Sequence, residues 1–310
     1  MLFLEEFPCA EERASYYQEE YYEEQTGNRF LGIFEWAIRA FRKARMKDVL
    51  RHLPQRIQED KKDAFLDIGC GRGLLLECFK KQGWQVAGTQ LSETASLACE
   101  RQHGVKVHRG ELPELKLESD SFRAIVLYHV LEHIDKPFDY LKEAHRLLRS
   151  DGLLVIEVPD ASSLGSRLLG SRNFCFDFPH HLFFFTPSTL RAALGRVGFS
   201  VSGSTRFSLE YTPYTTLQNL LNFLPGMPNR LYRSLMKNAE GVRLRKLSLT
   251  WIHFLLGMTL ALPAFIISLS NLIFPTGNTL RFYCRKAGAT RESVRESPVE
   301  KDQETIAEVV

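Results

Sequence analysis

The chain has 310 residues, enough for one α/β domain with additions or for two small domains. Apolar residues make up 44% and charged residues 25%, which is typical of a globular protein with a substantial core. The net charge of +3 argues against a nucleic-acid partner, and six scattered cysteines without a CxxC pair favour a reduced, cytoplasmic protein over a disulfide or zinc scaffold. The N-terminal residues lack the basic region of a secretory signal, so none is predicted.

The first 60 residues are expected to form an acidic, aromatic segment followed by a helical cap. Residues 5–24 carry eight Glu and one Arg, whereas residues 39–56 carry seven Lys or Arg and one Asp. Apolar residues recur at three- and four-residue steps between Phe30 and Phe41, which predicts a helix over 29–53. Its basic side is either a solvated face or a surface for an anionic partner or membrane.

Short apolar runs alternate with helical segments over residues 61–207, the predicted core. Strands are expected at 64–68, 85–89, 105–108, 123–128, 152–158 and 199–207, and helices at 73–82, 92–103, 136–149 and 187–197. This alternation predicts an α/β, Rossmann-like fold with a mostly parallel sheet covered on both faces. Such sheets bind ligands at the carboxyl ends of their strands.

A glycine-rich loop follows the first of these strands, in the order Asp67-Ile68-Gly69-Cys70-Gly71-Arg72-Gly73. Glycines let the backbone turn sharply and approach a ligand closely. Leu74 stands where a dinucleotide loop has its third glycine, which argues against an NAD site. An acid two residues before the first glycine is instead well suited to a ligand that carries an ammonium group.

Polar residues also follow the later strands of the predicted sheet. Gln90 ends the second strand, where an acid usually binds ribose hydroxyls and where an amide can still accept a hydrogen bond. After the third strand, Glu111 and Leu112 could contact an adenine, although an ordinary surface loop is the alternative. Tyr128 and His129 end the fourth strand, where a site is expected.

The motifs DIGCGRG, VAGTQLSETA, GELPEL, SDSFRAIVLYHVLEHIDKP and LLRSDGLLVIEVPD resemble, in this order, those of class I S-adenosylmethionine-dependent methyltransferases. The sequence is most similar to the small-molecule group that includes ubiquinone-pathway O-methyltransferases. The stretch FPHHLFFFTP also resembles methyltransferases of polysaccharide and glycolipid pathways. The resemblance covers about residues 60–206 and the last strand. It implies a seven-stranded sheet whose antiparallel last strand lies beside the sixth.

The resemblance also implies that S-adenosylmethionine binds at the ends of strands one, two and four. The cofactor-binding residues carried over are Asp67, Gly69, Gly71, Gly73, Gln90, Leu91, Glu111, Leu112, Tyr128 and His129. Among them, Asp67 would hold the methionine ammonium group, and Gln90 departs from the family acid. Tyr128 or His129 would touch the methionine end.

Methyl transfer is an in-line displacement from a sulfonium, so the protein mainly aligns donor and acceptor and excludes water. A base is needed only where the acceptor loses a proton, and histidines 129, 133, 180 and 181 are candidates. We expect His181 to be the base and His133 the second catalytic residue, against the alternative that either makes only a structural hydrogen bond. Some ubiquinone-pathway relatives place a divalent metal on an ExxEH pattern. His129 replaces the first acid here, so we expect no metal, although His129, Glu132 and His133 are chemically possible ligands.

Residues 208–278 are expected to form a hydrophobic helical insert, followed by the last strand at 279–286 and a disordered tail over 287–310. Leu247–Leu280 contains 34 residues without a charged side chain, more than the roughly 20 that span a bilayer. If the sixth and seventh strands pair, both ends of the insert lie on one side of a membrane. We therefore expect a hairpin with a bend at Pro263, an in-plane helix or a buried cap, not a single crossing. Preceding basic residues favour membrane contact through 247–275, with a cap or dimer contact as the alternative.

The sequence thus predicts an S-adenosylmethionine-dependent methyltransferase that methylates an oxygen of a small, lipid-linked or glycan-linked acceptor. We expect it to be cytoplasmic and peripheral at the inner face of a membrane, without a nucleic-acid partner. The alternatives are a non-catalytic binding or scaffold protein at a membrane, kept open by Gln90, and a nucleic-acid-modifying methyltransferase.

Overall fold

The computed structural model describes residues 2–3, 31–54, 62–177, 180–224, 228–231, 247–274 and 276–288. Most of the acidic N-terminal segment and the tail from residue 289 lie outside these ranges, so the expectations for them stay predictions. The side chains of 31–34, 247–251, 253 and 254 are also outside the description.

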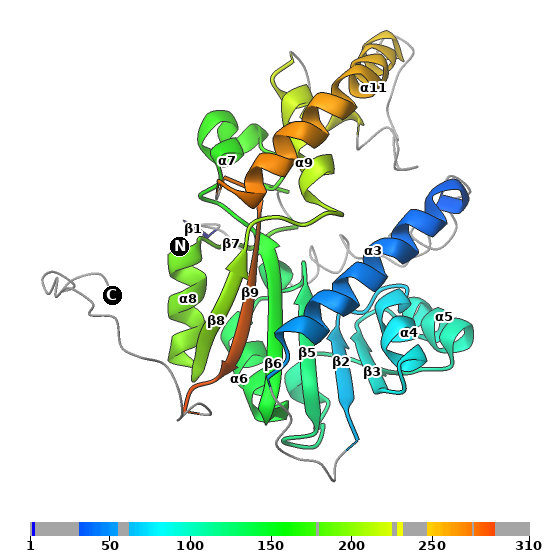
Figure 1. Cartoon of the computed structure of the whole chain (residues 1–310), viewed down its shortest axis with the longest axis vertical. Coiled ribbons are helices and arrows are strands. Elements are labelled where there is room, and N and C mark those ends of the chain that lie inside the picture. Colours follow the sequence, from blue (N-terminus) through cyan, green and yellow to red (C-terminus); the bar gives the residue numbers. More distant parts are fainter. Residues whose placement is uncertain are drawn as a thin grey trace, which may run out of the picture.

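A seven-stranded sheet in the order β4-β3-β2-β5-β6-β9-β8 forms the centre of the molecule (Figure 1). Its strands are β2 (Ala64–Ile68), β3 (Gln85–Gln90), β4 (Lys106–Arg109), β5 (Phe122–Tyr128), β6 (Leu148–Pro159), β8 (Phe199–Thr205) and β9 (Thr279–Lys286). Only β9 is antiparallel to its neighbours, β6 and β8. The predicted Rossmann-like sheet, with its antiparallel last strand beside the sixth, is confirmed.

Helices cover both faces of the sheet, because alternate side chains of the buried strands point to opposite sides. Leu66 and Ile68 of β2 belong to the apolar core that includes α6 (Pro137–Leu147) and α8 (Pro187–Arg196). Phe65 of the same strand belongs to the core with α3 (Leu31–His52), α4 (Leu74–Lys81) and α5 (Glu93–His103). The central strands β2 and β5 are therefore mostly apolar, as expected where both faces are buried, whereas the edge strands β4 and β8 also carry exposed residues.

Short elements line the edge of the sheet where the parallel strands end. They are η1 (Leu112–Glu114), η2 (Leu131–His133), α7 (Leu164–Leu169), η3 (Gly170–Arg172) and the small pair β1 (Leu2–Phe3) with β7 (Phe183–Phe184). The amide of Leu182 donates to the carbonyl of Glu132 at 2.8 Å. This bond ties the segment after β6 to the turn after β5, at the edge where a ligand is expected.

The insert before β9 contains α9 (Thr212–Asn222), α11 (Leu247–Leu269) and η5 (Ser270–Leu272), which stand above this edge (Figure 1). The chain does not form a hairpin turn at Pro263, since α11 continues through the proline. Buried residues lie on both sides of it, Gly257 before and Ala264 and Ser268 after, and α11 packs along α9. This packing accounts for a helix that the proline alone would interrupt.

The two ends of the insert meet where β8 and β9 lie side by side. A Cβ atom built on Gly277 would lie 1.9 Å from the carbonyl oxygen of Arg206. Only glycine therefore lets the returning chain pass the departing one at this distance.

Candidate functional site

The glycine-rich loop joins β2 to α4 through three residues with positive φ, Gly69 (71°), Gly71 (50°) and Gly73 (69°). A Cβ on Gly69 would lie 2.6 Å from Val130 Cγ2, and one on Gly73 would lie 2.2 Å from Cys99 Sγ. A Cβ on Gly71 would have no described atom within 4 Å. The outer two glycines are therefore required by packing, whereas Gly71 faces open space in which a ligand can approach the backbone.

Asp67 lies near the end of β2, directly before this loop, and is 6% exposed. Burial raises the pKa of Asp67 to about 7, although Arg42 and Arg45 of α3 act in the opposite direction. A ligand ammonium group beside this carboxyl would favour its ionised form. This environment is compatible with the predicted role of Asp67.

The residues predicted to hold the adenosine lie at the ends of β3 and β4. Gln90 is 8% exposed, and its Oε1 accepts a hydrogen bond from the amide of Leu91 at 3.0 Å. Its amide nitrogen can donate to a ribose oxygen, which a carboxylate cannot do. The Tyr140 hydroxyl donates to Glu111, and Leu112 is fully buried in the core. Sequence reasoning missed Tyr140, whose only signal was its position on the apolar face of the helix predicted at 136–149.

A buried cluster of charged side chains lies at the ends of β5 and β6. Glu157 is fully buried and accepts hydrogen bonds from Arg45 (2.9 Å) and Arg281 (2.7 Å), while His129 Nε2 lies 3.1 Å from the same carboxylate. His129 Nδ1 lies 3.3 Å from Glu132. Burial alone would lower the pKa of His129, but Glu132 and Glu157 outweigh it and raise this pKa to about 9. His129 is therefore an imidazolium at neutral pH, and its contact with the cofactor stays a prediction.

Tyr128 lies beneath this cluster, with the Arg45 guanidinium carbon 4.0 Å from its ring centroid. Burial raises the pKa of Tyr128 to about 12. Its hydroxyl is buried and has no hydrogen-bond partner among the described residues. Since buried hydroxyls almost always have a hydrogen-bond partner, a bound ligand could supply the partner here.

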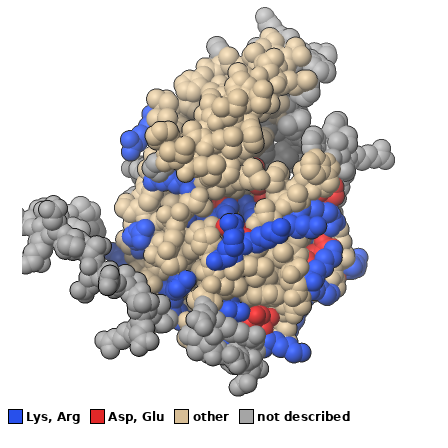
Figure 2. Space-filling model, viewed as in Figure 1, with Lys and Arg blue, Asp and Glu red and all other residues tan. Residues whose placement is uncertain are grey.

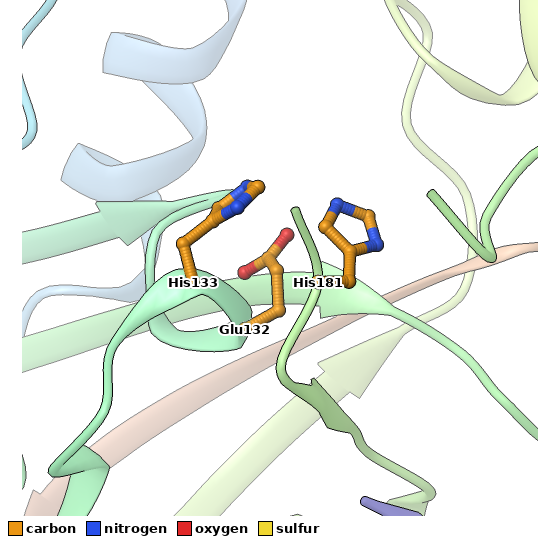
Figure 3. A group of neighbouring side chains, drawn as sticks. All are labelled: Glu132, His133 and His181. Carbon is orange, nitrogen blue, oxygen red and sulfur yellow. The ribbon is translucent and has the colours of Figure 1, made fainter. Parts of the chain in front are cut away.

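Two of the four candidate histidines come together beside Glu132 (Figure 3). His133 Nδ1 lies 2.9 Å from the carbonyl of His180, and His181 Nδ1 lies 2.9 Å from the carbonyl of Cys175. Because a carbonyl only accepts, each Nδ1 carries a proton, which in the neutral ring leaves the lone pair on Nε2. Burial lowers the pKa of His181 to about 4, with His133 acting in the same direction. His181 is therefore neutral at physiological pH.

The remaining candidate base, His180, is in a different environment. Its Nδ1 lies 3.3 Å from Asp177, and its side chain is 32% exposed.

One ligand atom each from Glu132, His133 and His181 lies within 4.8 Å of the other two. Among the described residues, this is the group that could hold a metal ion.

Comparison with known proteins agrees with this geometry. Residues 38–202, more than half of the chain, match the model of a methyltransferase domain family. A ubiquinone biosynthesis O-methyltransferase of Parvibaculum lavamentivorans is 35% identical over 97 residues, covering 30% of this chain and 38% of the relative. The Maricaulis maris enzyme of the same name is 30% identical over 163 residues, covering 48% and 63%. The chain thus matches less than two thirds of the length of each of these two relatives.

Among solved structures, an S-adenosylmethionine-dependent methyltransferase from Archaeoglobus fulgidus has the same fold. The TM-score is 0.50 at 19% identity, over 84% of this chain and 100% of that chain. The family match, the relatives and the fold together confirm the expected enzyme class and its cofactor, S-adenosylmethionine. The chain belongs to the class I S-adenosylmethionine-dependent methyltransferases.

Proposed function

We propose that this enzyme methylates an oxygen atom of a small, lipid-linked or glycan-linked acceptor that is presented at the inner face of a membrane. The observation that carries this proposal is α11, which directs large apolar side chains outward above the edge where the cofactor is expected. The O-methyltransferase relatives support oxygen as the receiving atom.

The acceptor would lie between the glycine-rich loop and the pair His133 and His181. His181 is neutral because burial lowers its pKa to about 4, and its Nε2 can therefore accept a hydrogen bond from an acceptor hydroxyl. An imidazole with this pKa is a weak base. It suffices because the attacking oxygen becomes strongly acidic as its bond to the methyl carbon forms. In this proposal His181 takes that proton, as predicted, and His133 positions the acceptor.

The polarity of α11 is the reverse of that in a water-soluble helix, which buries its large apolar residues. Its buried face carries Gly257, Ala264 and Ser268. Large apolar residues are exposed instead, among them Leu255 (59%), Met258 (65%), Leu262 (66%) and Ile266 (60%). An apolar face of this extent is typical of a surface that contacts lipid or another protein.

The stretch Leu255–Leu272 has a mean hydropathy of 1.8 and is long and apolar enough to cross a membrane, although only 22% of it is buried in the protein. The insert, however, leaves and returns at the same edge of the sheet, so a helix lying within one leaflet fits the topology better than a crossing. The uncharged surface of the insert adjoins the basic side chains of α3, which suit anionic headgroups (Figure 2).

The proposed function is tested by measuring transfer of a labelled methyl group from S-adenosylmethionine to matched phenolic acceptors. One acceptor carries an isoprenoid-like chain and is embedded in anionic vesicles; the other has the same headgroup without the chain. We expect the embedded acceptor to be methylated at least about tenfold faster, because embedding raises its local concentration. Equal rates for the two acceptors would refute lipid presentation, and no label in either would refute phenolic O-methylation.

The membrane contact has its own test, flotation of the protein with anionic vesicles. The double substitution Leu262→Gln with Ile266→Gln should abolish flotation while leaving the rate on the chain-free acceptor unchanged. Leu97→Gln is the matched control, since Leu97 is an exposed leucine (41%) on α5. If the double variant floats as well as the control, α11 does not bind the lipid surface.

A further inference from the structure

We propose that Glu132, His133 and His181 form a binding site for one divalent transition-metal ion of the Zn²⁺ type. The ligands would be a carboxylate oxygen and the two imidazole Nε2 atoms. The inference rests on the proposed function only in placing this ion beside the acceptor. With the ion bound, His181 Nε2 would be a ligand and not the base described above, and the ion would instead lower the pKa of the acceptor hydroxyl. Binding itself can be tested without turnover.

The two imidazoles are held as metal-binding histidines are held. A ligating histidine usually donates its other ring N–H to a backbone carbonyl or carboxylate, which fixes the ring and its tautomer. His133 and His181 both do so through Nδ1, at 2.9 Å from the carbonyls of His180 and Cys175. Figure 3 shows the Glu132 carboxylate between the two rings. The three donors therefore converge, with Nε2 as the ligand atom of each neutral ring.

Glu132 supplies the second, independent observation. Its side chain is fully buried, and neither carboxylate oxygen accepts a hydrogen bond among the described residues. His129 Nδ1 lies 3.3 Å from this carboxylate but makes no hydrogen bond to it. A buried carboxylate without hydrogen bonds is costly, and a cation between its oxygen and the two Nε2 atoms would offset that cost.

This ligand set differs from the ExxEH set considered from the sequence. His129 occupies the place of the first acid, but each of its two nitrogens already faces a carboxylate, Nδ1 that of Glu132 and Nε2 that of Glu157. The third ligand comes instead from His181, 48 positions after His133. Two bonds hold these segments together: His133 Nδ1 to the His180 carbonyl, and the Leu182 amide to the Glu132 carbonyl.

The geometry and the donor types decide the kind of ion. The donor atoms lie within 4.8 Å of one another, whereas donors around a tetrahedral Zn²⁺ are about 3.4 Å apart, so side-chain rotations of about 1 Å close the site. Two imidazoles and one carboxylate favour Zn²⁺, Fe²⁺ or Co²⁺ over Mg²⁺ and Ca²⁺, which prefer oxygen. Three protein ligands leave an open position. A bound ion would supply Lewis acidity to an acceptor oxygen there.

The test uses the full-length protein, stripped with a chelator and free of any polyhistidine tag. Zn²⁺ is titrated in competition with a chromophoric chelator, Co²⁺ binding is followed by visible absorption, and metal content is measured by mass spectrometry after dialysis. We expect one equivalent of tightly bound Zn²⁺, no competition from excess Mg²⁺, and a loss of affinity of at least about 100-fold in His181→Ala and in Glu132→Gln.

His180→Ala is the matched control, because it removes a neighbouring histidine side chain but keeps the carbonyl that holds His133. It should retain one equivalent of Zn²⁺. Thermal unfolding and S-adenosylhomocysteine binding show whether each variant is folded. Wild-type protein that binds Zn²⁺ no better than His181→Ala, or a control that loses as much affinity as His181→Ala, would overturn the site. Methyl transfer by fully stripped, Zn²⁺-incompetent protein would leave the proposed function standing, and Zn²⁺ binding without transfer would do the reverse.

Discussion

Cofactor affinity should depend on pH through Asp67. Burial raises the pKa of this carboxyl to about 7, and in its predicted role the carboxyl must be ionised to bind the ammonium group of the cofactor. With a pKa near 7, the ionised fraction increases from about one tenth at pH 6 to about nine tenths at pH 8. The affinity for S-adenosylhomocysteine should therefore increase about ninefold over this interval, or about 1.3 kcal/mol, with release of protons on binding.

Isothermal titration calorimetry at pH 6, 7 and 8, in two buffers of different ionisation enthalpy, measures both the affinity and the proton release. Asp67→Asn should bind about 10- to 100-fold more weakly at pH 8, because it loses a charge-assisted contact, and its affinity should not vary with pH. Asp120→Asn is the matched control, an exposed acid before β5, where a φ of 50° suits asparagine. The reasoning fails if wild type shows no pH dependence, or if Asp67→Asn keeps the dependence of the control.

Two further predictions concern the glycine-rich loop and the buried charges. Gly71→Ala and Gly83→Ala both place alanine at positive φ in open space (50° and 82°), so each should destabilise the fold by about 1 kcal/mol in urea unfolding. Only Gly71→Ala should weaken S-adenosylhomocysteine binding, by at least about tenfold, and equal losses in the two variants would contradict a ligand over Gly71. Folding raises the pKa of His129 from 6.5 to about 9, so its stabilising contribution is complete below pH 6.5 and is lost as the pH rises through 9. The free energy of unfolding should thus fall by up to about 3 kcal/mol between pH 6.5 and 10, and this fall should be absent in His129→Gln; parallel curves would refute it.

The sheet was predictable because its signals are local. The apolar runs and their spacing gave β2 at its observed bounds and β5 within one residue, and the glycines with their preceding acid identified the loop after β2. These features depend on residues that are close together in the sequence, so periodicity and turn chemistry are sufficient to find them.

The arrangement of the charged groups was not predictable in this way. His129 was expected at the cofactor, but its charge is set by Glu157, 28 positions later, while Arg45 and Arg281 reach the same carboxylate from α3 and β9. Likewise, Pro263 predicts an interruption when α11 is considered alone, whereas the helix continues through it and packs against α9. Contacts between distant segments decide such features, and a single sequence does not display them.

The meeting of the insert's two ends at Gly277 has a consequence for how such enzymes can diversify. Because β8 pairs with β9, Thr205 lies opposite Arg281, and the sheet itself holds the two ends of the insert together. The entropy cost of a longer or shorter loop grows only with the logarithm of its length, about 0.6 kcal/mol for each doubling. The segment between these strands is therefore an exchangeable module. Under the proposed function, its replacement by another helical segment would change the acceptor while the donor-binding half of the sheet stayed intact.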